Sequence, residues 1–301
     1  MVVGTLKIDA DVLTSAPFNH YKNASHWLIT LFFFAPGRVA VWWSAMNTHS
    51  TPNMHGTSHE HSSQNTHVTP DTHGSYDTQG TLGASTRLSL GVFVLVSVIH
   101  LINQLFSGEG LIDTVTQICL MAVLAVVLIA ATRDLTPRPR VVTYTLISLF
   151  FSWLGDTVPR FLEGDSSFMA MIGGFFVAQV FYAVAFWPYR GASLLRRPTF
   201  LLPYAGAAIV VVGVCWSGAG ALLPAVIAYV LVILTMAILA SGLGRIATLG
   251  GVLFLLSDSL IAFRSFTDAT LPTHGFLVML TYILGQGLLV WAVIRTAKDQ
   301  S

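Results

Sequence analysis

Two aspartates stand inside otherwise apolar stretches of the chain. Asp156 ends the string SLFFSWLGD, and Asp258 interrupts the string GGVLFLLSDSL. A carboxylate held at hydrocarbon depth costs about 2.5 to 3.5 kcal/mol on insertion scales, so ionisable residues in such stretches usually mark a pathway or an active site. The alternative is that each aspartate only caps or pairs within a helix bundle. We expect Asp156 and Asp258 to be functional.

Two carboxyl groups in unlike surroundings can divide acid and base chemistry between them, as in glycosidases. One stays protonated and donates its proton, while the other holds water or stabilises a positive charge. Because burial disfavours the charged form of a carboxyl group, the more deeply placed Asp258 is the candidate acid. Asp156, nearer the interface, is the candidate base or cation stabiliser, and the reverse assignment stays open.

Membrane-spanning helices must position these residues. Apolar residues make up 54% of the 301 residues and charged residues only 10%, and a spanning helix needs about 20 mostly apolar residues. Such runs lie near residues 89–106, 112–131, 141–157, 169–188, 200–216, 221–240, 246–263 and 274–294. Backbone groups in lipid must be paired internally, which favours helices. The sequence predicts an all-α polytopic bundle of eight transmembrane helices over 87–295, with a short tail over 296–301.

Basic residues alternate between the predicted loops and indicate an orientation. One side carries Arg87, Arg133, Arg138, Arg140, Arg190, Arg196, Arg197, Arg245, Arg295 and Lys298. The other side carries only Arg160 and Arg264. The positive-inside rule then places both termini in the cytoplasm. We expect a multi-pass protein of a bacterial cell membrane.

Further polar side chains recur in the outer halves of these helices, at spacings that put each set on one helical stripe. We interpret them as the lining of one polar cavity that opens outward, in preference to scattered core residues. The candidate binding residues are Asn103, Gln117, Gln179, Tyr182, Tyr282 and Gln286.

The two aspartate-bearing segments also suggest a parallel repeat of four plus four helices. One reads F-x-x-L-G-D up to Asp156, and the other reads F-L-L-S-D up to Asp258. Gln179 follows the first aspartate by 23 residues, and Tyr282 follows the second by 24. A site at the interface of two repeats is known in transporter folds.

Residues 1–86 differ from the rest, because they are polar and hold eight of the ten histidines. Low hydrophobicity predicts a disordered N-terminal extension. A His-rich tract can bind Zn, Cu or Ni loosely, although a solvated tail is the interpretation we favour. The tract consists of His49, His55, His59, His61, His67 and His73.

Four strings occur in order across the predicted helices: SLFFSWLGD, GGFFVAQVFYAV, GGVLFLLSDSLIAF and TYILGQGLLV. Together they resemble the YhhN family of membrane proteins, which includes the lysoplasmalogenases, over Arg87 to Arg295. The most specific elements are Gly155-Asp156, Ser257-Asp258 and the pair of Tyr282 with Gln286.

The resemblance implies hydrolysis of the vinyl ether bond of a lysoplasmalogen-type lysophospholipid to a fatty aldehyde and a glycerophospho-base. Protonation of the alkene carbon forms an oxocarbenium ion that water attacks, which suits a pair of carboxyl groups. Tyr282, Gln286 and Gln179 would then orient water and glycerol oxygens. Family members commonly have a histidine where this chain has Gln179, and often a lysine where it has Gln117.

Two other functions stay open. Membrane carboxylates and a possible repeat would suit a proton-coupled transporter, and the glutamines at 117 and 179 would suit a non-catalytic lipid-binding relative. No metal, nucleotide or nucleophile motif such as HExxH, a P-loop or GxSxG occurs. We expect no cofactor and no nucleic acid partner, only a lysophospholipid substrate and membrane lipids.

Overall fold

The structure is a computed structural model that describes residues 83–106, 108–267 and 271–301. Eight helices within these residues are long and apolar enough to cross a membrane. They are α3 (Ala84–Phe106), α4 (Leu111–Ala131), α5 (Arg140–Thr157), α6 (Gly164–Phe186), α7 (Leu202–Cys215), α8 (Leu223–Ala240), α9 (Arg245–Phe266) and α10 (His274–Asp299). The predicted all-α bundle of eight transmembrane helices is confirmed.

The bounds of the helices differ from the predicted bounds mainly at the start of the first helix and at the end of the last. Helix α3 begins at Ala84, so the last residues of the predicted polar extension already belong to a helix. Helix α10 continues to Asp299 and includes most of the predicted tail. A helix can extend beyond the hydrocarbon layer with polar turns, which hydropathy does not register. The expected disorder and metal binding of the His-rich tract fall outside the described residues.

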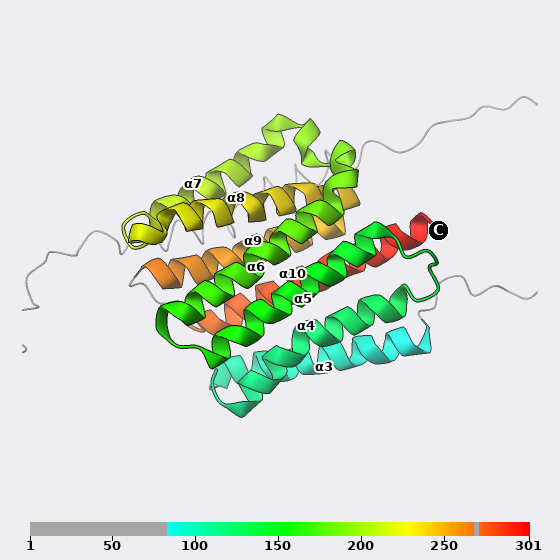
Figure 1. Cartoon of the computed structure of the whole chain (residues 1–301), viewed down its shortest axis with the longest axis horizontal. Helices are drawn as coiled ribbons and strands as arrows, with labels where there is room; N and C mark the ends of the chain where they lie inside the picture. The colour runs from blue at the N-terminus through cyan, green and yellow to red at the C-terminus, as the bar shows by residue number, and fades with distance from the viewer. Residues whose placement is uncertain (1–82, 107, 268–270) are drawn as a thin grey trace, which may run out of the picture. The chain divides into compact units, whose positions relative to one another are not determined.

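Helix α10 occupies the centre of the bundle. It packs against α9 most extensively and also against α3, α4 and α5, and Figure 1 shows α3 and α7 at opposite edges of the described bundle. Of the eight helices, α10 has the largest buried share and α7 the smallest. Side chains on α10 therefore reach neighbours on several helices at once.

Successive helices run in opposite directions, so their connections alternate between two ends of the bundle (Figure 1). The connections rich in arginine share one end with the C-terminus, whereas Arg160 and Arg264 belong to the opposite end. We call the second end the site end. Which end faces the cytoplasm stays a prediction from the positive-inside rule.

The end of α5 brings two charged residues to the site end. Asp156 lies in its last turn, and a short 3-10 helix, η2 (Val158–Phe161), follows directly. Pro159 has no N–H to donate, which favours the end of an α-helix shortly before it. Arg160 follows on η2, close enough to Asp156 for both side chains to belong to the same polar network.

Glycines allow close helix contacts beside both aspartate-bearing segments. A Cβ atom at Gly174 would lie 2.7 Å from the Cα atom of Gly155, the residue before Asp156. A Cβ atom at Gly250 would lie 3.0 Å from the carbonyl oxygen of Gly285. Small residues let helix backbones approach in membranes. These contacts hold α5 against α6 and α9 against α10.

Candidate active site

A cavity of about 420 Å³ lies at the site end of the bundle. Helices α3, α4, α5, α6, α9 and α10 and the short helix η2 all contribute to its wall. Its charged and strongly polar lining residues are Gln104, Asp113, Gln117, Asp156, Arg160, Ser167, Ser257, Asp258, Arg264, Ser265, His274 and Tyr282. Asp156 and Asp258, which belong to different helices, therefore face one cavity.

Asp156 is buried, and both of its carboxylate oxygens accept hydrogen bonds. The Gln117 amide nitrogen donates to Oδ1 at 3.2 Å, and the Tyr282 hydroxyl donates to Oδ2 at 2.8 Å. Hydrogen bonds to a charged group are stronger than those between neutral groups. Helices α4 and α10 thus hold the orientation of a carboxylate that belongs to α5.

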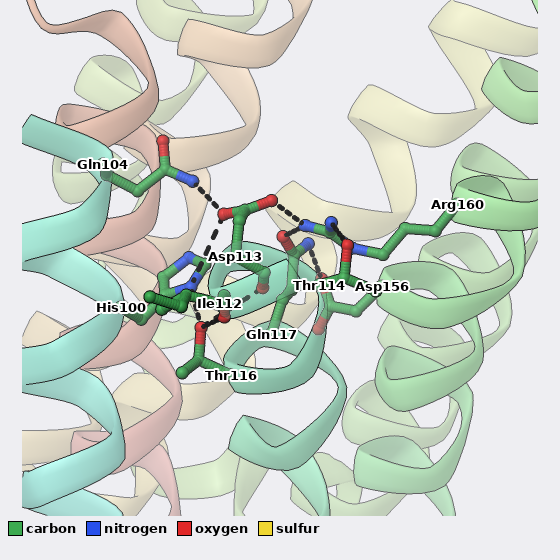
Figure 2. A network of polar contacts seen from close by, with 9 residues as sticks. All are labelled: His100, Gln104, Ile112, Asp113, Thr114, Thr116, Gln117, Asp156 and Arg160. Carbon is green, nitrogen blue, oxygen red and sulfur yellow. Dashed lines mark hydrogen bonds and ion pairs between the residues drawn. The ribbon is translucent and has the colours of Figure 1, made fainter. Parts of the chain in front are cut away.

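Arg160 determines which way the Gln117 amide points. Its guanidinium donates to the Gln117 carbonyl oxygen (Figure 2), and it has no acceptor atom with which to bind the amide nitrogen instead. The Gln117 nitrogen is therefore directed to Asp156. Arg160 also forms an ion pair with Asp113 at 2.7 Å and donates to the Thr114 hydroxyl at 3.1 Å.

Asp113 links this network to α3 (Figure 2). Its Oδ1 atom accepts a hydrogen bond from the Gln104 amide at 2.7 Å. His100 Nδ1 lies 3.7 Å from the same oxygen and 2.8 Å from the Thr116 hydroxyl. A chain of polar contacts therefore runs from α3 through α4 and η2 to Asp156.

Asp258 has different surroundings. Among the described residues, its one hydrogen bond comes from the Tyr229 hydroxyl of α8, at 2.5 Å to Oδ2. It lines the polar cavity and also a small cavity of about 60 Å³ between α6, α7, α8 and α9. That second cavity is otherwise almost entirely apolar, with Ala207, Val211, Val230, Ile233 and Phe266 in its wall. We call it the apolar groove.

A second buried network lies one turn further along α10. The Tyr182 hydroxyl donates to the Gln286 carbonyl oxygen at 2.5 Å, and the Gln286 nitrogen donates to the Ser152 hydroxyl at 3.1 Å. All three side chains are fully or almost fully buried. They support Tyr282, which precedes Gln286 by four residues on α10, without lining the cavity themselves.

The structure brings four of the eight expected site residues to the cavity wall: Asp156, Asp258, Gln117 and Tyr282. Tyr182 and Gln286 belong to the supporting network. Asn103 is half-buried on α3 and does not line the cavity. Gln179 is fully buried, away from the cavity wall, and neither of its amide atoms has a hydrogen-bond partner among the described residues.

Several polar residues of the cavity were not expected from the sequence. They are Asp113, Arg160, Arg264 and His274, together with Tyr229 of the apolar groove. One signal was present, because Asp113 precedes Gln117 by four residues and therefore shares its helix face. For Arg160 and Arg264, the sequence pattern indicates only loop residues that bear on orientation.

A comparison with protein families agrees with this arrangement. A model of the YhhN family matches residues 112–293, which is more than half of the chain. The chain belongs to the YhhN family. The matched segment includes Asp113, Asp156, Arg160, Asp258 and Tyr282, whereas α3 precedes it. No curated protein matches the chain, and neither does any solved structure.

Proposed function

We propose that this YhhN family member is a membrane hydrolase that cleaves the vinyl ether bond of lysoplasmalogen-type lysophospholipids. The observation that supports this most directly is that two aspartates from separate helices, Asp156 and Asp258, line one cavity. Vinyl ether hydrolysis needs a proton donor and a group that activates water, and both roles suit carboxyl groups. The family resemblance names the substrate class.

The hydrogen bonds support one assignment of roles. Asp156 accepts from two donors, Gln117 and Tyr282, an arrangement that suits an ionised carboxylate. Asp258 accepts from Tyr229 alone and borders the apolar groove, surroundings that suit a neutral carboxylic acid. Asp258 is therefore the proposed acid, and Asp156 is the proposed base.

Each carboxyl group gives up and regains one proton, or the reverse, during one turnover. Asp258 donates its proton to the alkene carbon that is not bonded to oxygen, and the other alkene carbon becomes part of an oxocarbenium ion. A water molecule adds to that carbon, and Asp156 accepts a proton from the water. The product of this step is a hemiacetal. Asp156 then protonates the departing glycerol oxygen as Asp258 takes the hemiacetal hydroxyl proton. The C–O bond breaks, the aldehyde and the glycerophospho-base form, and both carboxyl groups return to their starting states.

The two adjoining cavities suit a substrate with one hydrocarbon chain and a polar head. Asp258, Phe175 and Ile261 line both the polar cavity and the apolar groove. The apolar groove, at about 60 Å³, has room for only the first few carbons of the chain. A lipid with those carbons in the groove and its head group in the polar cavity would have its ether linkage near Asp258. Burying a hydrocarbon chain is favourable by about 0.8 kcal/mol per CH₂ group.

The glutamines at positions 117 and 179 are compatible with this proposal in different ways. Gln117 already donates a hydrogen bond to Asp156, and Arg160 supplies a positive charge to the same network. Gln179 does not line the cavity, so we expect a change there to leave the reacting groups in place. The transporter alternative has less support, because α9 continues without a break through Asp258, whereas transporter sites typically use discontinuous helices.

Purified protein in detergent, incubated with a lysoplasmalogen and analysed for aldehyde by mass spectrometry, tests the proposal. Wild type should release aldehyde, and Asp156→Asn and Asp258→Asn should lose at least about 100-fold in kcat. Asp134→Asn is the matched control, because Asp134 is exposed and belongs to the connection between α4 and α5. A folded wild-type protein that releases no aldehyde would contradict the proposal.

A further inference from the structure

We propose that Arg264, His274 and the first turn of α10 form a binding site for the phosphate group of the lipid substrate. The inference rests on the proposed function for the identity of the lipid, and it adds a subsite for its anionic head. All three elements lie at the site end, and Arg264, His274 and Gly275 line the polar cavity.

Arg264 lines the cavity without an ion pair to any residue that the structure describes. Its counterpart Arg160 is neutralised by the ion pair with Asp113 at 2.7 Å. Among the described residues, no ion pair or hydrogen bond involves the Arg264 side chain, which is exposed at the end of α9. A guanidinium presents its N–H donors in a planar fork that matches phosphate oxygens. A phosphate would therefore fit the donors that Arg264 presents at the cavity.

His274 provides a second, independent indication of a ligand. It is buried, with 9% of its surface exposed, and its Nδ1 atom has no hydrogen-bond partner among the described residues. An unpaired buried polar atom is costly, so native proteins usually provide a partner. His274 is also close enough to Arg264 for the two side chains to interact electrostatically. A ring nitrogen that can donate a hydrogen bond, next to an arginine, suits an anionic ligand.

The first turn of α10 adds backbone donors. The first intrahelical bond of this region runs from the Leu277 N–H to the Thr273 carbonyl oxygen, so the preceding N–H groups have no partner within the helix. Gly275 lines the cavity wall, and the Gln104 side-chain oxygen packs directly against it, so this turn already faces one acceptor and has room there only because residue 275 has no side chain. The N-terminus of a 26-residue helix also carries a partial positive charge.

The position of this site agrees with the geometry of a lysophospholipid. Arg264 follows Asp258 by six residues on α9, a distance of about 9 Å along the helix axis. The side chain of arginine can bridge part of this distance. A glycerol unit would connect an ether oxygen near Asp258 to a phosphate near Arg264, while the hydrocarbon chain enters the apolar groove, which lies beside Asp258 towards α7 and α8.

Binding to lipids that this enzyme cannot cleave tests the subsite separately from turnover. The probes are a lysophosphatidylcholine with an ester-linked chain and a monoacylglycerol with the same chain, each titrated onto the purified full-length protein in detergent. Wild type should bind the phosphate-containing lipid more tightly. Arg264→Gln should weaken that binding about tenfold and leave the monoacylglycerol unaffected. His274→Gln should have the same selective effect, and Arg138→Gln, an exposed arginine at the opposite end, should have none.

The inference is overturned if the two lipids bind equally well to wild type, or if Arg264→Gln weakens both alike. Inorganic phosphate and glycerophosphocholine serve as competitors. If inorganic phosphate binds to wild type but not to Arg264→Gln, and does not compete with the lipid, the site binds a free anion. That result would refute the role in binding the lipid head group. Selective lipid binding without aldehyde release would refute the proposed function and keep the subsite. Aldehyde release by wild type, together with an unchanged KM in Arg264→Gln, would support the proposed function and refute the subsite.

Discussion

Asp156 and Asp258 have the same side chain, similar burial and one cavity in common, yet their neighbours differ. Asp156 receives hydrogen bonds from α4 and α10 and is joined through Gln117 to an arginine. Asp258 receives one hydrogen bond, from Tyr229, and borders an apolar groove. These surroundings suit an ionised carboxylate at Asp156 and a protonated carboxylic acid at Asp258. The proposed division into base and acid depends on this difference.

The largest expected effects come from removing each carboxyl group. Asp156→Ala and Asp258→Ala should each lower kcat by at least about 100-fold. Added formate should restore part of the activity of Asp156→Ala, because a small carboxylate can enter the polar cavity and act as a base. Formate should fail to restore Asp258→Ala, which needs a proton donor. If formate restored aldehyde release in Asp258→Ala and not in Asp156→Ala, the roles of acid and base would be reversed.

The tyrosine that donates to each carboxyl group should matter unequally. Tyr282→Phe removes a hydrogen bond to the proposed ionised Asp156 and should lower kcat about tenfold. Tyr229→Phe removes the donor to the proposed neutral Asp258, and its effect should stay below about threefold. Steady-state kinetics on both variants, with binding of a non-cleavable lipid as the control, compares them directly. A larger loss in Tyr229→Phe would contradict the comparison.

The network behind Asp156 should contribute to stability as well as to orientation. Asp113→Asn removes the negative charge that faces Arg160 at 2.7 Å, and we expect a loss of about 2 kcal/mol in the free energy of unfolding. Thermal unfolding in detergent measures this effect as a lower Tm. Asp134→Asn removes an exposed partner of Arg133 and should leave the Tm unchanged. Equal Tm values for the two variants would show that the buried ion pair is unimportant.

The smallest effect is expected at Gln179. Replacing its unpartnered, fully buried amide with the similarly sized apolar side chain of leucine should raise stability by about 1 kcal/mol. Activity should stay within about twofold, because Gln179 does not line the cavity. A large loss of kcat in Gln179→Leu would show instead that this residue acts on the substrate, as the sequence first suggested.

The possible parallel repeat stays a prediction. In the sequence, Gln179 and Tyr282 occupy matching positions after the two aspartates. In the structure, Tyr282 donates to Asp156, whereas Asp258 is paired with Tyr229 of α8. The two halves therefore use different helices to hold their carboxyl groups, whatever their origin.

The sequence alone determined the class of the fold and identified two acidic residues that line the cavity. Hydropathy is a local property, so eight apolar runs identified eight helices, and only their polar ends were misplaced. A carboxyl group within an apolar run is also a local signal, which is why Asp156 and Asp258 stood out. Asp113 and Arg160 did not, because they lie at helix ends, where charged residues are ordinary.

Tertiary structure alone decided which polar side chains meet. Tyr282 and Asp156 are 126 residues apart in the sequence, and Tyr229 and Asp258 are 29 apart. Their contacts depend on how each helix is rotated about its axis and on how closely glycines let the backbones approach. Packing between neighbouring helices sets both quantities. A helical stripe read from the sequence therefore indicates which residues face the same way, but only the packed bundle assigns each stripe its partner.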